Sequence, residues 1–250
     1  MKIFYTGEFY EPNLSIADLS ISFSKVNDIR NYRYPLYSLY FDLKKLLNKP
    51  DAETIFLQKK KFCCFVVSNE NCPTRNKFFH QLSRYKKVDS RGKYLNNIGA
   101  PVKDKKTFIS DYKFVLSFEN KSYPGYVTEK IVEPMIVNSI PIYWGDPYIN
   151  NDFNSKSFVN INDFKSIKQA INYIIELDND DRLYKKLMTE PWFTNNQLNE
   201  NYLPENLLFK LVNMIENRGN RNEVNLELPN VMALFYDSIK RKLRGERKYY

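Results

Sequence analysis

The sequence predicts an α/β fold built on a parallel sheet, because apolar runs of strand length alternate with longer amphipathic segments. Strands are expected at 62–67, 114–118 and 140–144. Helices are expected at 76–85, 127–138, 167–177, 181–188 and 204–216. Strands that alternate with helices join by right-handed crossovers into parallel sheets. Such sheets bind ligands beyond the carboxyl ends of their strands, so the residues after each strand are the first candidates for a site.

The first 58 residues form a less regular part. A short strand at 2–5 ends at Thr6-Gly7-Glu8, a second strand is expected at 19–23, and the aromatic-rich stretch 32–47 becomes helical near 38–43. Pro50-Asp51 and the Lys59-Lys60-Lys61 run indicate a boundary or hinge. The predicted division is 1–58, 59–216 and a basic amphipathic tail at 217–250.

Composition narrows the class of protein. A chain of 250 residues can bury the core of one or two domains, and its net charge of +9 favours anionic partners: nucleotides, nucleic acids or an acidic membrane surface. Cys63, Cys64 and Cys72 lack metal-ligand spacing, and we interpret them as reduced thiols. With one histidine and no clustered ligands, no metal site is expected. No recognisable nucleic-acid-binding module is present.

The stretch Phe114–Lys130 combines a buried strand, a polar loop with Pro124 and Gly125, and the start of a helix. This order places backbone N–H groups at the carboxyl edge of the sheet, where α/β proteins bind phosphates. Lys130 stands in the first helical turn, which is the unfavourable end of the helix dipole for a cation. An anionic ligand would explain its position. Pro134, within the same predicted helix, is expected to kink it at a cost of about 3 kcal/mol.

Glu8 and Arg75 each follow a strand. Glu8 can act as a general base if a cleft faces it, although on spacing alone a surface carboxylate in a turn explains it better. Arg75, in a polar loop where Thr74 could cap the next helix, offers a fork of donors that suits a phosphate. A surface arginine near a helix start explains Arg75 equally well.

Three further residues of the central stretch have two explanations each. Asn120 can bond a ligand or form an Asx turn. Tyr126 can stack on a base or hold a phosphate oxygen, but in a chain with 19 tyrosines a half-buried loop aromatic is the simpler interpretation. Glu129 can accept hydrogen bonds from sugar hydroxyls or simply complement the helix dipole.

Together these segments resemble the α1,3/α1,4-fucosyltransferase family, glycosyltransferase family 10, in its bacterial Helicobacter-like branch. The central motif is Phe118-Glu119-Asn120 followed by Tyr126-Val127-Thr128-Glu129-Lys130. Phe4-Tyr5-Thr6-Gly7-Glu8, the stretch 67–76, Ile140-Pro141-Ile142-Tyr143-Trp144-Gly145-Asp146-Pro147 and the stretch 152–158 also match. The resemblance covers roughly residues 2–187, and the central motif is long and specific.

The resemblance implies a GT-B fold, with two Rossmann-like domains facing a cleft. It implies an inverting transfer of L-fucose from GDP-fucose to a hydroxyl of N-acetylglucosamine in an N-acetyllactosamine-type acceptor. Glu8 would be the general base. The donor would be bound by Arg75, Asn120, Tyr126, Glu129 and Lys130, with Arg75 and Lys130 on the diphosphate.

The family needs no tightly bound metal, so a divalent ion would at most stimulate the reaction. Products of this kind include Lewis antigens, lipopolysaccharide O-antigens and glycosylated proteins. We expect a cytoplasmic protein whose basic tail either contacts the inner, anionic face of a membrane or packs as a final helix on the body. We expect no nucleic-acid partner.

The start of the chain departs from the family, because only Met1 and Lys2 precede the segment that carries Glu8. An incomplete acceptor-side domain is therefore expected. The alternative function is a shortened relic that binds GDP or GDP-fucose and transfers nothing. The sequence leaves the acceptor, the 1,3 or 1,4 linkage and the oligomeric state open.

Overall fold

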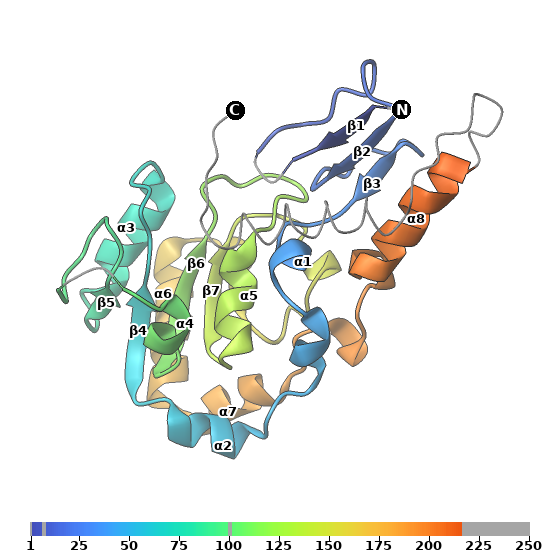
Figure 1. Cartoon of the computed structure of the whole chain (residues 1–250). Helices are drawn as coiled ribbons and strands as arrows, with labels where there is room; N and C mark the ends of the chain where they lie inside the picture. Colours follow the sequence, from blue (N-terminus) through green and yellow to red (C-terminus); the bar gives the residue numbers. More distant parts are fainter. Residues whose placement is uncertain (1, 7–8, 100–101, 217–250) are drawn as a thin grey trace.

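The computed structural model describes residues 2–6, 9–99 and 102–216, which form two parallel sheets with helices around them (Figure 1). The smaller sheet has the order β1-β2-β3 and the larger the order β5-β4-β6-β7-β8. The strands are β1 Ile3–Tyr5, β2 Leu19–Ser22, β3 Asn31–Arg33, β4 Lys61–Phe65, β5 Val88–Ser90, β6 Tyr112–Phe118, β7 Ile140–Trp144 and β8 Val159–Asn160. Every strand pairing within the described residues is parallel, as the alternation of strands and helices predicted.

Helices and short 3₁₀ turns connect the strands. The α-helices are α1 Tyr37–Tyr40, α2 Ala52–Gln58, α3 Pro73–Leu82, α4 Lys105–Ile109, α5 Glu129–Ile136, α6 Ile167–Asn179, α7 Asp181–Thr189 and α8 Pro204–Glu216. The 3₁₀ turns are η1 Leu43–Leu47, η2 Ile149–Asn151, η3 Ile161–Asp163, η4 Thr194–Asn196 and η5 Glu200–Tyr202. None of the described helices is long and apolar enough to pass through a bilayer.

The central strands of the larger sheet are buried on both faces. Cys63 of β4 belongs to the main core cluster, whereas Cys64 packs with Tyr112 and Val115 in a separate cluster, because successive strand residues point to opposite faces. The three cysteines are buried and free, as expected. Phe118 of β6 pairs in register with Trp144 of β7, so both strands end at the same sheet edge.

Some local predictions were incomplete or wrong. The boundary or hinge expected at Pro50-Asp51 and Lys59-Lys60-Lys61 stays a prediction. Between these two segments lies α2, which was not predicted and which Asp51 caps by accepting the backbone N–H of Thr54 at 2.9 Å. Helix α3 begins at Pro73 with Cys72 in the cap position, so Thr74 lies inside the helix and does not cap it. Strands β3, β5 and β8 and helix α4 were not predicted, since each spans only two to five residues.

The chain returns to the smaller sheet at its last described helix. Leu207 of α8 is buried against Leu19 and Ile21 of β2 and against Tyr34. Tyr32 also donates its hydroxyl to the backbone oxygen of Asn201, at 2.7 Å. The end of the predicted 59–216 unit therefore completes the core of the sheet near the N-terminus (Figure 1). The predicted tail, 217–250, lies outside the described residues.

Candidate functional site

A cavity of about 320 Å³ lies beyond the carboxyl end of β6. Its lining comes from the start of α5, the loop before it and the region of α1: Leu36, Tyr40, Asn120, Tyr126, Thr128, Glu129 and Lys130. Four of the five residues expected to bind the donor are in this set. Its volume lies at the lower end of the range for small-molecule sites.

The loop between β6 and α5 is shaped by its contacts with both sheets. The Glu119 N–H donates to the Trp144 oxygen at 2.8 Å, which extends the β6–β7 pairing by one residue. Gly125 has φ of +85°, and a Cβ there would lie 2.5 Å from the Phe23 oxygen. Only glycine fits this left-handed, crowded position. The loop can thus approach the smaller sheet and place Tyr126 5.2 Å from the Phe23 ring.

At the wall of the cavity lies a cluster of Glu119, Thr128 and Lys130. The Glu119 carboxylate is fully buried and accepts the Thr128 N–H at 2.8 Å, the Thr128 hydroxyl at 2.8 Å and the Lys130 ammonium at 3.1 Å. Lys130 Nζ also donates to Thr128 Oγ1 at 2.9 Å and lies 3.6 Å from Glu129 Oε1. A carboxylate of the chain itself therefore sits at the start of α5, where the sequence predicted an external anion.

The charges in and beside this cluster shift the pKa values of Glu119, Glu129 and Lys130. Burial disfavours the Lys130 ammonium, but the carboxylates of Glu119 and Glu129 outweigh burial and raise the pKa of Lys130 above its ordinary value. Burial also raises the pKa of Glu119, while Lys130 opposes that rise. For Glu129, burial works against the charged form, but Lys130 prevails and lowers the pKa. Lys130 thus stays cationic across the physiological pH range.

Arg75 lies behind the cavity and does not line it. Its side chain is completely buried, with Nη1 donating to Asn120 Oδ1 at 3.0 Å and Nη2 donating to the Asn69 backbone oxygen. Burial lowers the pKa of Arg75 from its ordinary value. In this arrangement Arg75 fixes Asn120, so its expected contact with a diphosphate stays a prediction.

Glu8 lies outside the described residues. The next residue, Phe9, packs edge-on against Tyr123 at 4.9 Å and Tyr126 at 5.3 Å between ring centroids. The segment after Glu8 is therefore attached to the same loop that lines the cavity. The role of Glu8 stays a prediction.

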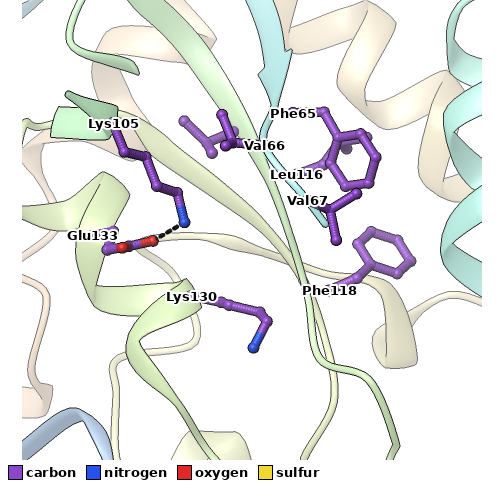
Figure 2. Close-up of a pocket in the computed structure, with 9 residues that line it drawn as sticks. Phe65, Val66, Val67, Lys105, Leu116, Phe118, Lys130 and Glu133 are labelled. Atoms are coloured by element: carbon purple, nitrogen blue, oxygen red, sulfur yellow. Dashed lines mark hydrogen bonds and ion pairs between the residues drawn. The ribbon is translucent and has the colours of Figure 1, made fainter. Parts of the chain in front are cut away.

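A second, much smaller cavity of about 20 Å³ lies between α5 and the strands β4 and β6 (Figure 2). It can hold about one water molecule. Figure 2 shows Lys105 paired with Glu133 on one side, and the Lys130 ammonium pointing away from that pair. Since Lys130 lines both cavities, its side chain forms part of the wall between them.

Sequence reasoning missed Glu119, Thr128, Leu36 and Tyr40 as parts of the site. A carboxylate directly after an apolar strand and a threonine just before a helix were the available signals for the first two. Nothing in the local pattern marked Leu36 and Tyr40. Across residues 2–6, 9–99 and 102–216, no group of three or more His, Cys, Asp or Glu side chains is arranged to hold a metal ion.

Comparison with known proteins agrees with the motif. The family model for glycosyltransferase family 10 (fucosyltransferase), C-terminal part, matches residues 56–220. A model for the N-terminal domain of α-(1,3)-fucosyltransferase FucT matches residues 1–40.

Two relatives illustrate the range of similarity. The α-(1,3)-fucosyltransferase FucT of Helicobacter pylori is 34% identical over 252 residues, which is 84% of this chain and 51% of the relative. The human GDP-fucose protein O-fucosyltransferase 3 is 29% identical over 195 residues, or 71% of this chain and 40% of the relative. The chain thus spans about half the length of the curated relatives it matches.

A crystal structure of an α1,3-fucosyltransferase with GDP-fucose superposes with a TM-score of 0.76 and 32% identity, covering 88% of this chain and 76% of that one. This likeness and the two parallel sheets confirm the predicted α/β fold of GT-B type. The chain belongs to glycosyltransferase family 10, a family of fucosyltransferases, and is similar to its Helicobacter members.

Proposed function

We propose that this protein transfers L-fucose from GDP-fucose, with inversion, to a hydroxyl of N-acetylglucosamine in an N-acetyllactosamine-type acceptor. The observation that carries the proposal is that Asn120, Tyr126, Glu129 and Lys130 all line one cavity of about 320 Å³. A cation, an amide, an aromatic ring and a carboxylate suit a diphosphate, a base and sugar hydroxyls. A solved α1,3-fucosyltransferase of similar fold is described as a complex with GDP-fucose.

The proposed reaction gives Glu8 and Lys130 one chemical task each. Glu8 takes the proton of the acceptor hydroxyl, whose oxygen attacks the anomeric carbon of fucose opposite the GDP. The bond from this carbon to the diphosphate oxygen breaks, and GDP leaves with the electron pair. The Lys130 ammonium offsets the charge that develops on the leaving diphosphate.

The rest of the donor is recognised by groups that are already ordered. Arg75 holds Asn120 through its Nη1, so the amide is oriented before the donor arrives. Glu129 accepts hydrogen bonds from ribose or fucose hydroxyls, and Tyr126 packs against the donor. The chain itself provides this donor chemistry without a tightly bound metal, which would at most stimulate turnover.

The acceptor and the location belong to the same proposal. The matched relatives include both an α-(1,3)-fucosyltransferase and a protein O-fucosyltransferase, so family membership leaves the acceptor open. We propose a glycan acceptor of the kind found in Lewis antigens and O-antigens, and a cytoplasmic protein whose basic tail, 217–250, contacts an anionic membrane.

The experiment measures GDP binding by calorimetry together with fucose transfer to N-acetyllactosamine. Glu8→Gln should abolish transfer and leave GDP affinity within about twofold of wild type, because the base contacts the acceptor and not the nucleotide. Lys130→Met should weaken GDP binding on the order of tenfold. Glu176→Gln, an exposed substitution on α6, serves as the matched control and should retain both properties.

Two outcomes would overturn the assignment. GDP binding without any transfer by the wild-type chain would identify a binding protein and not an enzyme. Unchanged GDP affinity in Lys130→Met would contradict the placement of the diphosphate in the cavity that Lys130 lines.

A further inference from the structure

The cluster of Glu119, Thr128 and Lys130 at the cavity wall holds more contacts than a helix cap requires. The Thr128 hydroxyl alone caps α5 by accepting the Lys130 N–H at 3.5 Å. The same hydroxyl donates to Glu119 and accepts from the Lys130 ammonium, which uses its one proton and two lone pairs. The Thr128 hydroxyl therefore has no hydrogen-bonding capacity left, and it restrains the Lys130 side chain.

The position of Glu119 is itself enforced by the backbone. A Cβ on Gly145 would lie 2.6 Å from Glu119 Cγ, so only glycine leaves room for this side chain at the end of β7. The Glu119 backbone is also bonded on both sides, to the Trp144 oxygen through its N–H and to the Cys72 thiol, at 3.6 Å, through its oxygen. The carboxylate has little freedom to move away from Lys130.

Burying a carboxylate costs free energy that a simple apolar contact would avoid. Glu119 has no exposed side-chain surface, whereas 21% of the Lys130 side chain remains exposed on the side of the cavity. The ammonium has three N–H groups. Two of these N–H groups are directed toward Glu119 and Thr128. The third can therefore point toward Glu129, a residue that lines the cavity.

We propose that Glu119 is a positioning residue that holds the Lys130 ammonium at the wall of the cavity, with one N–H directed toward the leaving diphosphate. This inference rests on the proposed function, because it assigns Lys130 to the diphosphate. Glu119 acts entirely through Lys130 and touches no substrate. The energetic benefit appears in the transition state, where a fixed ammonium requires no reorganisation as charge develops.

A double-mutant cycle with Glu119→Gln and Lys130→Met tests this inference. Glutamine keeps the size and one acceptor oxygen of Glu119, but it presents an amide N–H group that cannot bind the ammonium. We expect Glu119→Gln to lower kcat by about 10- to 100-fold in the Lys130 background. In the Lys130→Met background, it should lower kcat no further.

A matched control uses the neighbouring ion pair. Glu133 also lies on α5 and pairs with Lys105, but it does not line the larger cavity. Glu133→Gln should therefore retain a wild-type kcat. Equal losses from Glu119→Gln and Glu133→Gln, or additive losses in the cycle, would indicate a general structural role and would overturn the inference.

Thermal unfolding supplies a readout that does not depend on transfer. Lys130→Met leaves the Glu119 carboxylate buried without a cation and should lower Tm by several degrees. Adding Glu119→Gln should restore Tm, since the double variant buries no charge. If the wild-type chain transfers no fucose, the proposed function fails. The recovery of Tm in the double variant still tests whether Glu119 and Lys130 form a buried ion pair. A further drop in Tm in the double variant would refute the pairing, even if Glu119→Gln alone does not fold.

Discussion

A buried ion pair helps to connect the two sheets, so Arg33→Met should destabilise the protein strongly. Arg33 of β3 binds the Asp152 carboxylate through Nη1 at 2.9 Å and Nη2 at 2.6 Å, and its Nη1 also contacts the Tyr202 hydroxyl. Burial works against the guanidinium charge, but Asp152 outweighs it, and the pKa of Arg33 lies above its ordinary value. Arg33, Asp152 and Tyr202 thus connect three segments of the chain: strand β3, the residue that follows η2, and the turn η5.

The expected loss of stability follows from the groups that stay buried after Arg33→Met. The Asp152 side chain is fully buried, and removing one partner of a buried ion pair typically costs about 3–5 kcal/mol. Tyr202 stays 3.3 Å from Asp152 Oδ1 and can still donate its hydroxyl, so we expect the lower value, about 3 kcal/mol. At about 2–4 °C per kcal/mol for a chain of this size, Tm should fall by about 6–12 °C.

Scanning calorimetry measures this shift, with Arg30→Met as the matched control. Arg30 also forms an ion pair, with Asp28 at 2.7 Å, but 45% of the Arg30 side chain and 26% of the Asp28 side chain are exposed, and such surface pairs contribute little. Its Tm should equal that of wild type within error. Equal shifts in the two variants would refute the argument that the buried pair connects the sheets.

Three further outcomes are expected. Gly125→Ala should lower Tm more than Gly99→Ala, because both glycines have positive φ but only the Cβ at Gly125 would meet a backbone oxygen, at 2.5 Å; equal shifts would contradict the close approach. Burial lowers the pKa of Lys59 from 10.5 to about 8, so the unfolded chain binds more protons between these pH values. The free energy of unfolding of wild type relative to Lys59→Met should therefore rise with pH across that range in urea titrations; a difference that does not change with pH would contradict the burial of the Lys59 charge. Deleting 217–250 should reduce sedimentation with phosphatidylserine vesicles and not with phosphatidylcholine vesicles; unchanged sedimentation would exclude the tail as the membrane contact.

The main elements of the larger sheet could be predicted because their local pattern and their burial agree. Strand β6 and helix α5 were expected at 114–118 and 127–138 and are observed at Tyr112–Phe118 and Glu129–Ile136. Pro134 lies inside α5, two residues before its end, and the kink expected from its missing N–H stays a prediction.

Other elements could not be predicted because tertiary contacts, and not local pattern, determine them. Strand β3 spans three residues and is held by its pairing with β2 and by the Arg33–Asp152 ion pair. Helix α2 was not predicted, because the charged residues on either side of it indicated a boundary. Its Asp51 cap was nevertheless a signal for a helix start in the sequence.

The same distinction applies to the site. Asn120, Tyr126, Glu129 and Lys130 lie within eleven residues of one motif, so a family resemblance located them together. The sequence alone could not show that Arg75 is buried behind Asn120. It also could not show that the anion beside Lys130 is Glu119, because that pairing requires the β7 edge and Gly145 to be in place.

An analysis of the reaction products tests whether the cavity beside Lys130 supports fucose transfer. The chain is incubated with GDP-fucose and N-acetyllactosamine, released GDP is quantified, and the fucosylated product is examined by NMR. We predict one GDP released for each fucoside formed, with the anomeric configuration opposite to that of the donor. Retained configuration would contradict the direct displacement. Bound GDP-fucose without any fucoside would contradict fucose transfer by this protein.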